Sequence, residues 1–182
     1  VRGGWNFGDA YTIYFYAKFD TPAKSFGTWK SGKVQPGVKS QYDTNEKSGA
    51  YFTFDTREKS VVNVKVGISY LGYNKAAVNA SEITGWSLDQ VKDNAKAEWN
   101  SLLSRIDVEG GTDEQKTIFY SSFYRIFMQP TDYTDENPVW ITDKPYYGDY
   151  HAIWDTFRAT HPFINLLQPT LGGKMVESMV DI

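Results

Sequence analysis

The densest group of residues able to do chemistry lies at 146–163, where aromatic and ionisable side chains are mixed. On a helix that begins near Ile153, Trp154 and Arg158 are four residues apart and Asp155 and Arg158 are three apart, so they occupy neighbouring positions. A carboxylate and a guanidinium bind vicinal sugar hydroxyls, and an indole covers the apolar side of a pyranose ring. These residues predict a sugar contact. The competing interpretation is a structural Asp–Arg pair that caps a core tryptophan.

Other candidate groups carry weaker signals. His151 and His161 are the only histidines, and their spacing of ten residues does not suggest a zinc pair, so structural or solvent roles are expected. The loop at 132–137 is rich in oxygen ligands but lacks the glycine and terminal glutamate of a calcium loop, and it is interpreted as solvated. No metal site is therefore predicted from these residues, and no glycine-rich sequence has the pattern of a phosphate-binding loop.

The composition excludes several classes of partner. The 182 residues include 19 Lys and Arg against 22 Asp and Glu, which gives a formal charge of −3 and no positive field that would attract nucleic acid. No run approaches the roughly 18 to 20 apolar residues of a membrane span. With zero cysteines there is no disulfide framework and no thiol nucleophile. Aromatic residues make up 16% of the chain, many beside polar residues, which is typical of sugar sites.

The elements that position these groups change type along the chain. Residues 11–19, 50–56 and 61–70 are predicted strands, because aromatic and β-branched residues dominate them. In the third, Val62, Val64, Val66 and Ile68 alternate with polar residues, which predicts an antiparallel strand with that face buried. Residues 30–47 are rich in Gly, Ser and Lys and are predicted to be a long connection.

Beyond Tyr70 the pattern is helical. A capping signal at 87–90 precedes an apolar stripe that extends to Ile106, and a second capping signal at 112–115 opens a helix that is apolar nearly all round until Pro130. A third helix is predicted from Ile153 to just before Pro162. Further helical pieces are expected at 163–167, ending at Pro169, and from 174 to 180.

The predicted elements do not complete a domain. A β-sandwich of this kind has about seven strands, and only three or four are visible here. The second helix needs cover on several sides, which the short helices that follow can hardly supply. We therefore expect an internal segment of a larger protein, spanning the end of a β domain and the start of a helical domain.

The succession of motifs resembles glycoside hydrolase family 92, a family of exo-acting α-mannosidases. The motifs occur in the family's order and cover most of the chain. They are residues 25–29, 66–70 with Asn79, 99–110, 119–130 and, above all, Trp154-Asp155-Thr156-Phe157-Arg158 followed by His161-Pro162.

The resemblance implies the end of an antiparallel β-sandwich followed by the first helices of an (α/α)6 barrel. The expected division is 1–72 for the sandwich part, 73–86 for a linker helix or connection, and 87–182 for the start of the catalytic barrel. It also implies that Trp154, Asp155 and Arg158 help to bind the terminal mannose. No catalytic or metal-ligating residue is expected within the chain, because the family's acid, base and most calcium ligands come from positions that would lie beyond Ile182.

The resemblance further implies a calcium-assisted, inverting hydrolysis of terminal α-linked mannose, with an α-1,2 linkage as the first expectation. The expected partners are a mannose-containing glycan and the remaining chain of the parent protein, and the expected location is secreted, periplasmic or at the cell surface. The 133–150 loop departs from the commonest family pattern, which leaves the linkage preference open.

Two alternatives have the same layer order or composition. One is another sandwich-plus-helical-barrel enzyme, such as a glucoamylase-like hydrolase or a disaccharide phosphorylase. The other is a non-catalytic carbohydrate-binding or interaction module, which the absence of a recognisable acid/base pair in the chain favours. We expect the full-length parent protein to be an active α-mannosidase and the isolated 182-residue chain to have no hydrolytic activity.

Overall fold

The computed structural model describes residues 11–42, 47–150 and 152–182. They form two compact units. The strand unit comprises Phe15–Ile68 and Tyr73–Trp86, and the helical unit comprises the described residues up to Tyr14, then Ser69–Gly72 and Ser87–Ile182. The first ten residues of the predicted sandwich range, and the candidate His151, lie outside the described residues.

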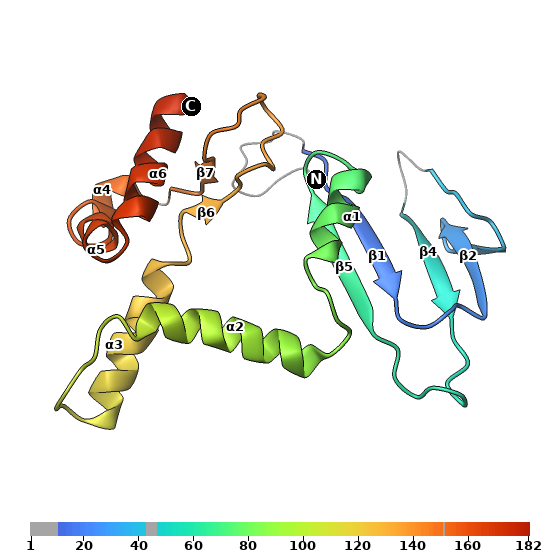
Figure 1. Ribbon diagram of the computed structural model, residues 1–182. Helices are drawn as coiled ribbons and strands as arrows, with labels where there is room; N and C mark the ends of the chain where they lie inside the picture. The colour runs from blue at the N-terminus through green and yellow to red at the C-terminus, as the bar shows by residue number, and fades with distance from the viewer. Residues whose placement is uncertain (1–10, 43–46, 151) are drawn as a thin grey trace. The chain divides into compact units, whose positions relative to one another are not determined.

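The strand unit contains two small sheets and one helix (Figure 1). One sheet has the order β3-β2-β4 with antiparallel neighbours, and the other pairs β1 with β5. The elements are β1 (Tyr14–Phe19), β2 (Ser25–Lys30), β3 (Lys33–Pro36), β4 (Ser48–Thr53), β5 (Val64–Ser69) and α1 (Tyr73–Ser81).

The β2–β3 hairpin corrects the prediction of a continuous connection at 30–47. Ser31 and Gly32 both have positive φ, 49° and 74°, and they join Lys30 to Lys33 as a two-residue turn. Such a turn matches the twist of the flanking strands. Strand β3 was missed because it has only four residues and ends at a proline, which a strand at the edge of a sheet tolerates.

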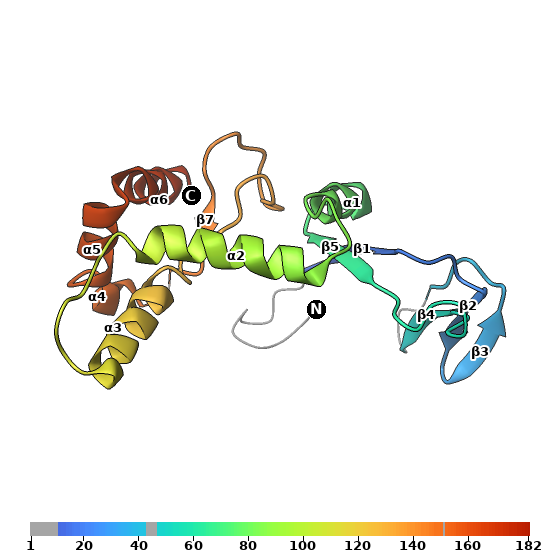
Figure 2. The ribbon, with the colours of Figure 1, turned by 60° about the horizontal axis from the view of Figure 1, so that its bottom comes forward.

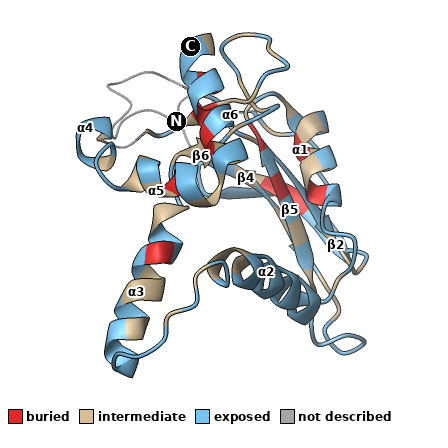
Figure 3. Cartoon of the chain, turned by 60° about the vertical axis from the view of Figure 1, so that its left-hand side comes forward, coloured by how far each residue is buried: buried red, intermediate tan, exposed pale blue. Residues whose placement is uncertain are grey.

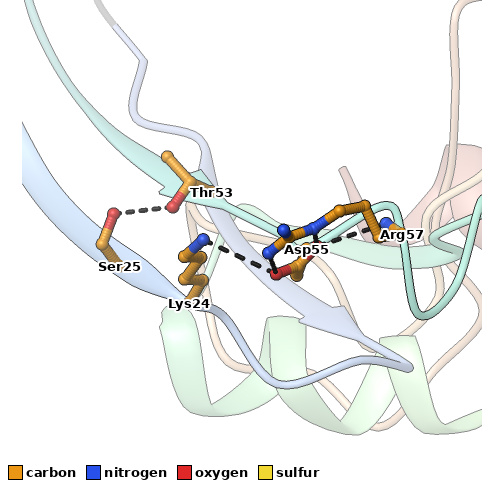
Figure 4. A network of polar contacts seen from close by, with 5 residues as sticks. All are labelled: Lys24, Ser25, Thr53, Asp55 and Arg57. Carbon is orange, nitrogen blue, oxygen red and sulfur yellow. Dashed lines mark hydrogen bonds and ion pairs between the residues drawn. The ribbon is translucent and has the colours of Figure 1, made fainter.

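Strand β4 ends earlier than the predicted 50–56. The side chain of Asp55 accepts a hydrogen bond from the backbone N–H of Arg57 at 3.2 Å, which turns the chain away from the sheet. The Arg57 guanidinium also binds the Asp55 carboxylate at 2.6 and 2.9 Å and lowers its pKa, with Lys24 at 3.6 Å (Figure 4). Because these cations are exposed, the group mainly fixes the loop and adds little stability.

Strand β5 buries the face opposite to the predicted one. Val64, Val66 and Ile68 are 51%, 52% and 58% exposed, whereas Gly67 and Ser69 on the other face are buried. The prediction of a buried valine face is therefore wrong for the described chain. Alternation shows that a strand has two different faces, but which face is covered depends on the neighbouring element, here helix α1 behind Gly67.

We expect Gly67→Ala to destabilise the protein by about 1–3 kcal/mol, because the added methyl group overpacks a backbone contact. Its Cβ would collide with the carbonyl oxygen of Ala76 and lie 2.5 Å from the backbone nitrogen of Ala80, and neither atom can rotate away. Gly72→Ala is the matched control, because a Cβ there meets nothing within 4 Å. Urea midpoints compare the two variants. Equal midpoints for both would show that α1 does not lie against β5 as described.

The helical unit contains five helices and a short strand pair among its described residues (Figures 1 and 2). Strands β6 and β7 pair antiparallel, with Thr131 opposite Gly148 and Asp132 opposite Tyr147. The elements are α2 (Leu88–Leu103), α3 (Asp113–Ile126), β6 (Thr131–Asp132), β7 (Tyr147–Gly148), α4 (Ile153–Thr156), α5 (Thr160–Leu167) and α6 (Pro169–Asp181).

The two predicted helix starts are present. Thr112 and Gln115 form a full capping box, in which each side chain binds the other residue's backbone N–H at 3.2 and 2.9 Å. At α2 the Ser87 hydroxyl accepts the N–H of Gln90, but the Gln90 side chain binds Asn94 instead, so only half of the predicted box forms. The helix also ends at Leu103, three residues before Ile106.

The apolar stripe of α2 has little cover within the described chain. None of its residues is buried (Figure 3), and Leu88 at its start is 79% exposed. The C-terminal half is partly covered, since the ring of Trp99 lies 4.3 Å from that of Tyr124. An amphipathic helix has this exposed stripe when its packing partner is missing. No described helix is both long and apolar enough to cross a membrane.

The core of the helical unit is small. Tyr147, Ile164 and Met175 form its buried cluster, and Phe123 of α3 is 1% exposed among aromatic neighbours. The Ser178 hydroxyl accepts the backbone N–H of Tyr147 at 2.8 Å, which joins α6 to β7. The ring of Phe123 in α3 also lies 5.4 Å from that of Phe163 in α5, and this contact positions the two helices against each other.

The predicted helix from Ile153 to Pro162 is interrupted. Helix α4 ends at Thr156, a turn covers 157–159, and α5 starts at Thr160 and continues through Pro162. Pro162 is in the first turn of α5, where a backbone N–H has no helical partner, so proline does not break the helix there. For the same reason Pro169 begins α6 at its first position.

Candidate functional site

Ala152, the residue before α4, has a left-handed backbone conformation. Ala152 has φ 46° and ψ 61°, a conformation that costs a non-glycine residue about 1–2 kcal/mol. The turn that follows is closed by the N–H of Asp155, which donates to the carbonyl of Ala152 at 2.8 Å. Strain of this kind concentrates at functional sites. It sets the direction in which Trp154 and Asp155 leave the backbone.

A cavity of about 380 Å³ lies beside this turn. One wall comes from α3 and the residues that follow it, including Arg125 and Gln129. The other wall comes from residues around α4 and the start of α5, including Tyr150, Asp155 and His161. We call this space the Asp155 cavity. It combines a carboxylate, a guanidinium, an amide and an imidazole, which are groups that bind hydroxyls of a neutral ligand.

The structure brings only one of the three predicted sugar-binding residues to this cavity. Asp155 is exposed and lines it. Trp154 is 78% exposed and is not among the lining residues. Arg158 is also exposed, and its guanidinium lies over the ring of Phe157, 5.5 Å from the centroid.

The structural alternative of an Asp–Arg pair over a core tryptophan is wrong. No ion pair joins Asp155 to Arg158 in the described parts of the chain. The helix ends at Thr156, so the two side chains do not share a continuous helical face. The exposed Trp154 belongs to no core.

Among the polar lining residues, Arg125 and Gln129 were not found from the sequence, and His161 was expected to have only a structural or solvent role. Arg125 and Gln129 lie four apart at the end of α3 and just after it, and His161 is the second residue of α5. His161 Nε2 lies 2.9 Å from the Thr156 hydroxyl, which fixes the ring against α4. The available signal was a pair of polar residues at helical spacing in an otherwise apolar stretch, which alone does not identify a site.

The loop at 132–137 is more structured than predicted. The carboxylate of Glu136 accepts the Ser69 hydroxyl at 2.7 Å and the backbone N–H of Tyr70 at 2.9 Å. Asp132 accepts the phenol of Tyr147 at 3.0 Å. The prediction of a solvated loop is therefore wrong for the half-buried Glu136, whereas Asp132 is exposed. Both acids organise the backbone around β6 and β7.

We expect the protein to lose stability between pH 10 and 12, and Tyr147→Phe to reduce that loss. Burial, together with the bond to Asp132, raises the pKa of Tyr147 to about 12, against about 10 in an unfolded chain. Its contribution is fully present below pH 10 and disappears as the pH rises through 12, because the unfolded state releases the proton first. Thermal midpoints at pH 9 and pH 11.5 test this. Tyr42→Phe, at an exposed position, should lose as much as the unsubstituted protein.

Calcium ligands are not assembled in the described residues. Within 11–42, 47–150 and 152–182 no group of three or more His, Cys, Asp or Glu side chains could hold a metal ion. The described residues alone therefore do not form a site that fits the calcium ion implied by the family resemblance.

Comparison with known proteins agrees with this architecture. The model of the glycosyl hydrolase family 92 N-terminal domain matches residues 1–69, and the model of that family's catalytic domain matches residues 75–182. An uncharacterised secreted glycosidase of Arthroderma benhamiae is 32% identical over 119 residues, which are 62% of this chain and 16% of that protein.

Solved structures give the same result. A family GH92 inverting mannosidase of Bacteroides thetaiotaomicron is 27% identical with a TM-score of 0.75, and a GH92 family glycosyl hydrolase named ccman5 is 28% identical with a TM-score of 0.70. Each match covers 93% of this chain and 24% of the solved chain, so the chain spans about a quarter of their length. The predicted fold class is confirmed: an antiparallel β-sandwich end followed by the first helices of a helical barrel. The chain belongs to glycosyl hydrolase family 92.

Proposed function

We propose that this chain forms part of an exo-acting α-mannosidase that removes terminal α-linked mannose, α-1,2-linked in the first instance, with inversion. The observation that carries the proposal is the Asp155 cavity, where an exposed carboxylate meets a guanidinium and an amide in a space large enough for a sugar ring. The mannosidase relatives support the choice of mannose, and the family match disfavours a glucoamylase-like hydrolase or a phosphorylase.

Within that enzyme the chain supplies part of the mannose pocket. Asp155 binds a sugar hydroxyl from the cavity wall, while Trp154 and Arg158, both exposed, contribute from the adjoining surface. Inversion requires two carboxyl groups about 6.5–9.5 Å apart, one to protonate the leaving oxygen and one to activate water. Asp155 is the one carboxylate among the described lining residues, which supports acid, base and calcium ligands from other parts of the protein.

The apolar surface of the helices supports the same proposal. The stripe of α2 and residues such as Ile118 of α3 are exposed in this chain. Covering such residues in a longer chain would bury apolar area at a gain of about 25 cal/mol per Å². The relative in Arthroderma benhamiae is a secreted glycosidase, which supports a secreted location.

The test is hydrolysis of an aryl α-mannoside and α-1,2-mannobiose by the full-length protein, with and without a calcium chelator. The expected first product is β-mannose, seen by proton NMR before mutarotation, and the chelator should lower the rate. Residues 1–182 alone should release no mannose. Release of α-mannose first, or activity on α-glucosides only, would overturn the proposal, and turnover by the isolated chain would place the acid and base within it.

A further inference from the structure

A second cavity, of about 370 Å³, is associated with the same β6–β7 pair as the Asp155 cavity. All of its lining residues belong to the helical unit. Four of the six are tyrosines, and the set is Tyr11, Tyr70, Tyr133, Glu136, Pro138 and Tyr146. We call it the tyrosine cavity. We propose that it is a second sugar subsite, which binds a neutral hexopyranose unit of the glycan beyond the mannose held at the Asp155 cavity. This inference rests on the proposed function.

Residues that flank the β6–β7 pair line both cavities. Pro130, just before β6, lines the Asp155 cavity, and Tyr133, just after β6, lines the tyrosine cavity. Tyr146, just before β7, lines the tyrosine cavity, and Tyr150, two residues after β7, lines the Asp155 cavity. An extended chain advances about 3.3 Å per residue, so the residues from Pro130 to Tyr133 span at most about 10 Å. The two linings are therefore close along the backbone, and a glycan bound at both cavities would pass this strand pair.

The tyrosine rings are held in place before any ligand arrives. The ring of Tyr133 lies 5.9 Å from that of Tyr70, at 72°, and 6.1 Å from that of Tyr146. Its hydroxyl donates to Asp149 at 2.6 Å, which raises the pKa of Tyr133 to about 12. Gly148 lies against the same ring, where a Cβ would be only 2.9 Å from Cε2. A preformed site avoids the entropy cost of ordering rings on binding.

The chemistry of this wall favours a neutral sugar over a cation. The Tyr70, Tyr133 and Tyr146 side chains are half-buried, so each ring keeps an accessible part that can pack on the C–H face of a pyranose. Aromatic rings can hold a cation by cation–π attraction, and a carboxylate directed at the ligand would strengthen that preference. The Glu136 carboxylate instead accepts two hydrogen bonds, from the Ser69 hydroxyl and the Tyr70 N–H, which offset part of its charge.

The loop that carries Tyr146 is fixed by one carboxylate of α6. Asp181 accepts Trp140 Nε1 at 3.3 Å and the Thr142 hydroxyl at 3.0 Å, and it pairs with Lys144 Nζ at 2.5 Å. The Trp140 ring then lies 5.3 Å from that of Tyr146, edge to face. The loop therefore sets which glycans the second subsite accepts.

The experiment compares a long and a short substrate in the full-length protein. For Tyr146→Ala, the ratio of kcat/KM for α-1,2-mannotriose to kcat/KM for an aryl α-mannoside should fall about three- to tenfold, because one aromatic contact to the distal sugar is lost. Tyr146→Phe retains the ring and should keep the ratio. Tyr42→Ala, at an exposed position outside the cavity, is the matched control and should keep it as well.

The outcomes separate this inference from the proposed function. An unchanged ratio for Tyr146→Ala, or equal losses on both substrates, would overturn the second subsite while leaving the mannosidase intact. If the full-length protein hydrolyses no mannoside, the proposed function fails, and binding of mannotriose measured by saturation-transfer NMR decides the subsite by itself. In that case, loss of binding in Tyr146→Ala but not in Tyr146→Phe supports it, and equal binding in both overturns it. Preferential binding of a quaternary ammonium probe would identify a cation site instead.

Discussion

Replacing Asp155 by alanine is expected to lower kcat/KM of the full-length enzyme on an aryl α-mannoside by about 30-fold or more, which is about 2 kcal/mol of transition-state binding. The carboxylate is exposed on the wall of the Asp155 cavity, where it accepts hydrogen bonds from sugar hydroxyls in the proposed complex. Its loss leaves those hydroxyls without a charged partner, and hydrogen bonds to charged groups contribute about 1.5–3 kcal/mol.

The control for this variant is Asp93→Ala. Asp93 is an exposed carboxylate on α2 that is absent from the lining of the Asp155 cavity, so its removal changes the net charge equally without touching the site. Circular dichroism spectra of both variants check that the helices are retained. A folded Asp155→Ala protein with the kcat/KM of the control would assign Asp155 a structural role and leave the cavity without its principal sugar ligand.

Replacing Phe123 by alanine is expected to destabilise the protein by about 3–5 kcal/mol, the largest effect on stability that we predict. Phe123 is 1% exposed, and its ring lies 5.4 Å from that of Phe163 and 5.6 Å from that of Phe127. The contact with Phe163 connects α3 to α5, and the two helices contribute to different walls of the Asp155 cavity. The vacancy left by the ring should therefore loosen the site as well as the core.

Chemical denaturation followed by fluorescence measures this effect. Lys116→Ala, at a half-buried position of the same helix outside the aromatic core, serves as the reference and should change the free energy of unfolding much less than Phe123→Ala. A Phe123→Ala variant as stable as the Lys116→Ala variant would mean that α3 does not pack on α5 through this ring. The two walls of the Asp155 cavity would then not be held together by this ring contact.

Local signals in the sequence were sufficient for several elements. The capping box of Thr112 and Gln115 forms as predicted because both partners lie within one turn of the same helix. The family, too, was correctly identified from the succession of short motifs around Trp154 and Asp155. The domain boundaries and the roles of Trp154, Asp155 and Arg158 remain predictions.

Other features depended on contacts between distant residues. The burial of Gly67 in place of the neighbouring valines follows from the position of α1, which no alternation pattern contains. The end of α4 at Thr156 removed the helical spacing on which a shared face of Asp155 and Arg158 was predicted. Each error came from treating a segment as if its own periodicity decided its environment.

The sequence by itself determined the kind of chain this is: strands followed by amphipathic helices, with a Trp-Asp-x-x-Arg run that carries the family's signature. Only the tertiary structure decided which side chains line one cavity, since Arg125 and Gln129 come from the end of α3 and His161 from α5, whereas Asp155 comes from α4. The physical reason is that helix starts depend on interactions within a few residues of the chain. A binding site depends on how whole elements pack, and that packing is governed by burial of surface between positions far apart in the chain.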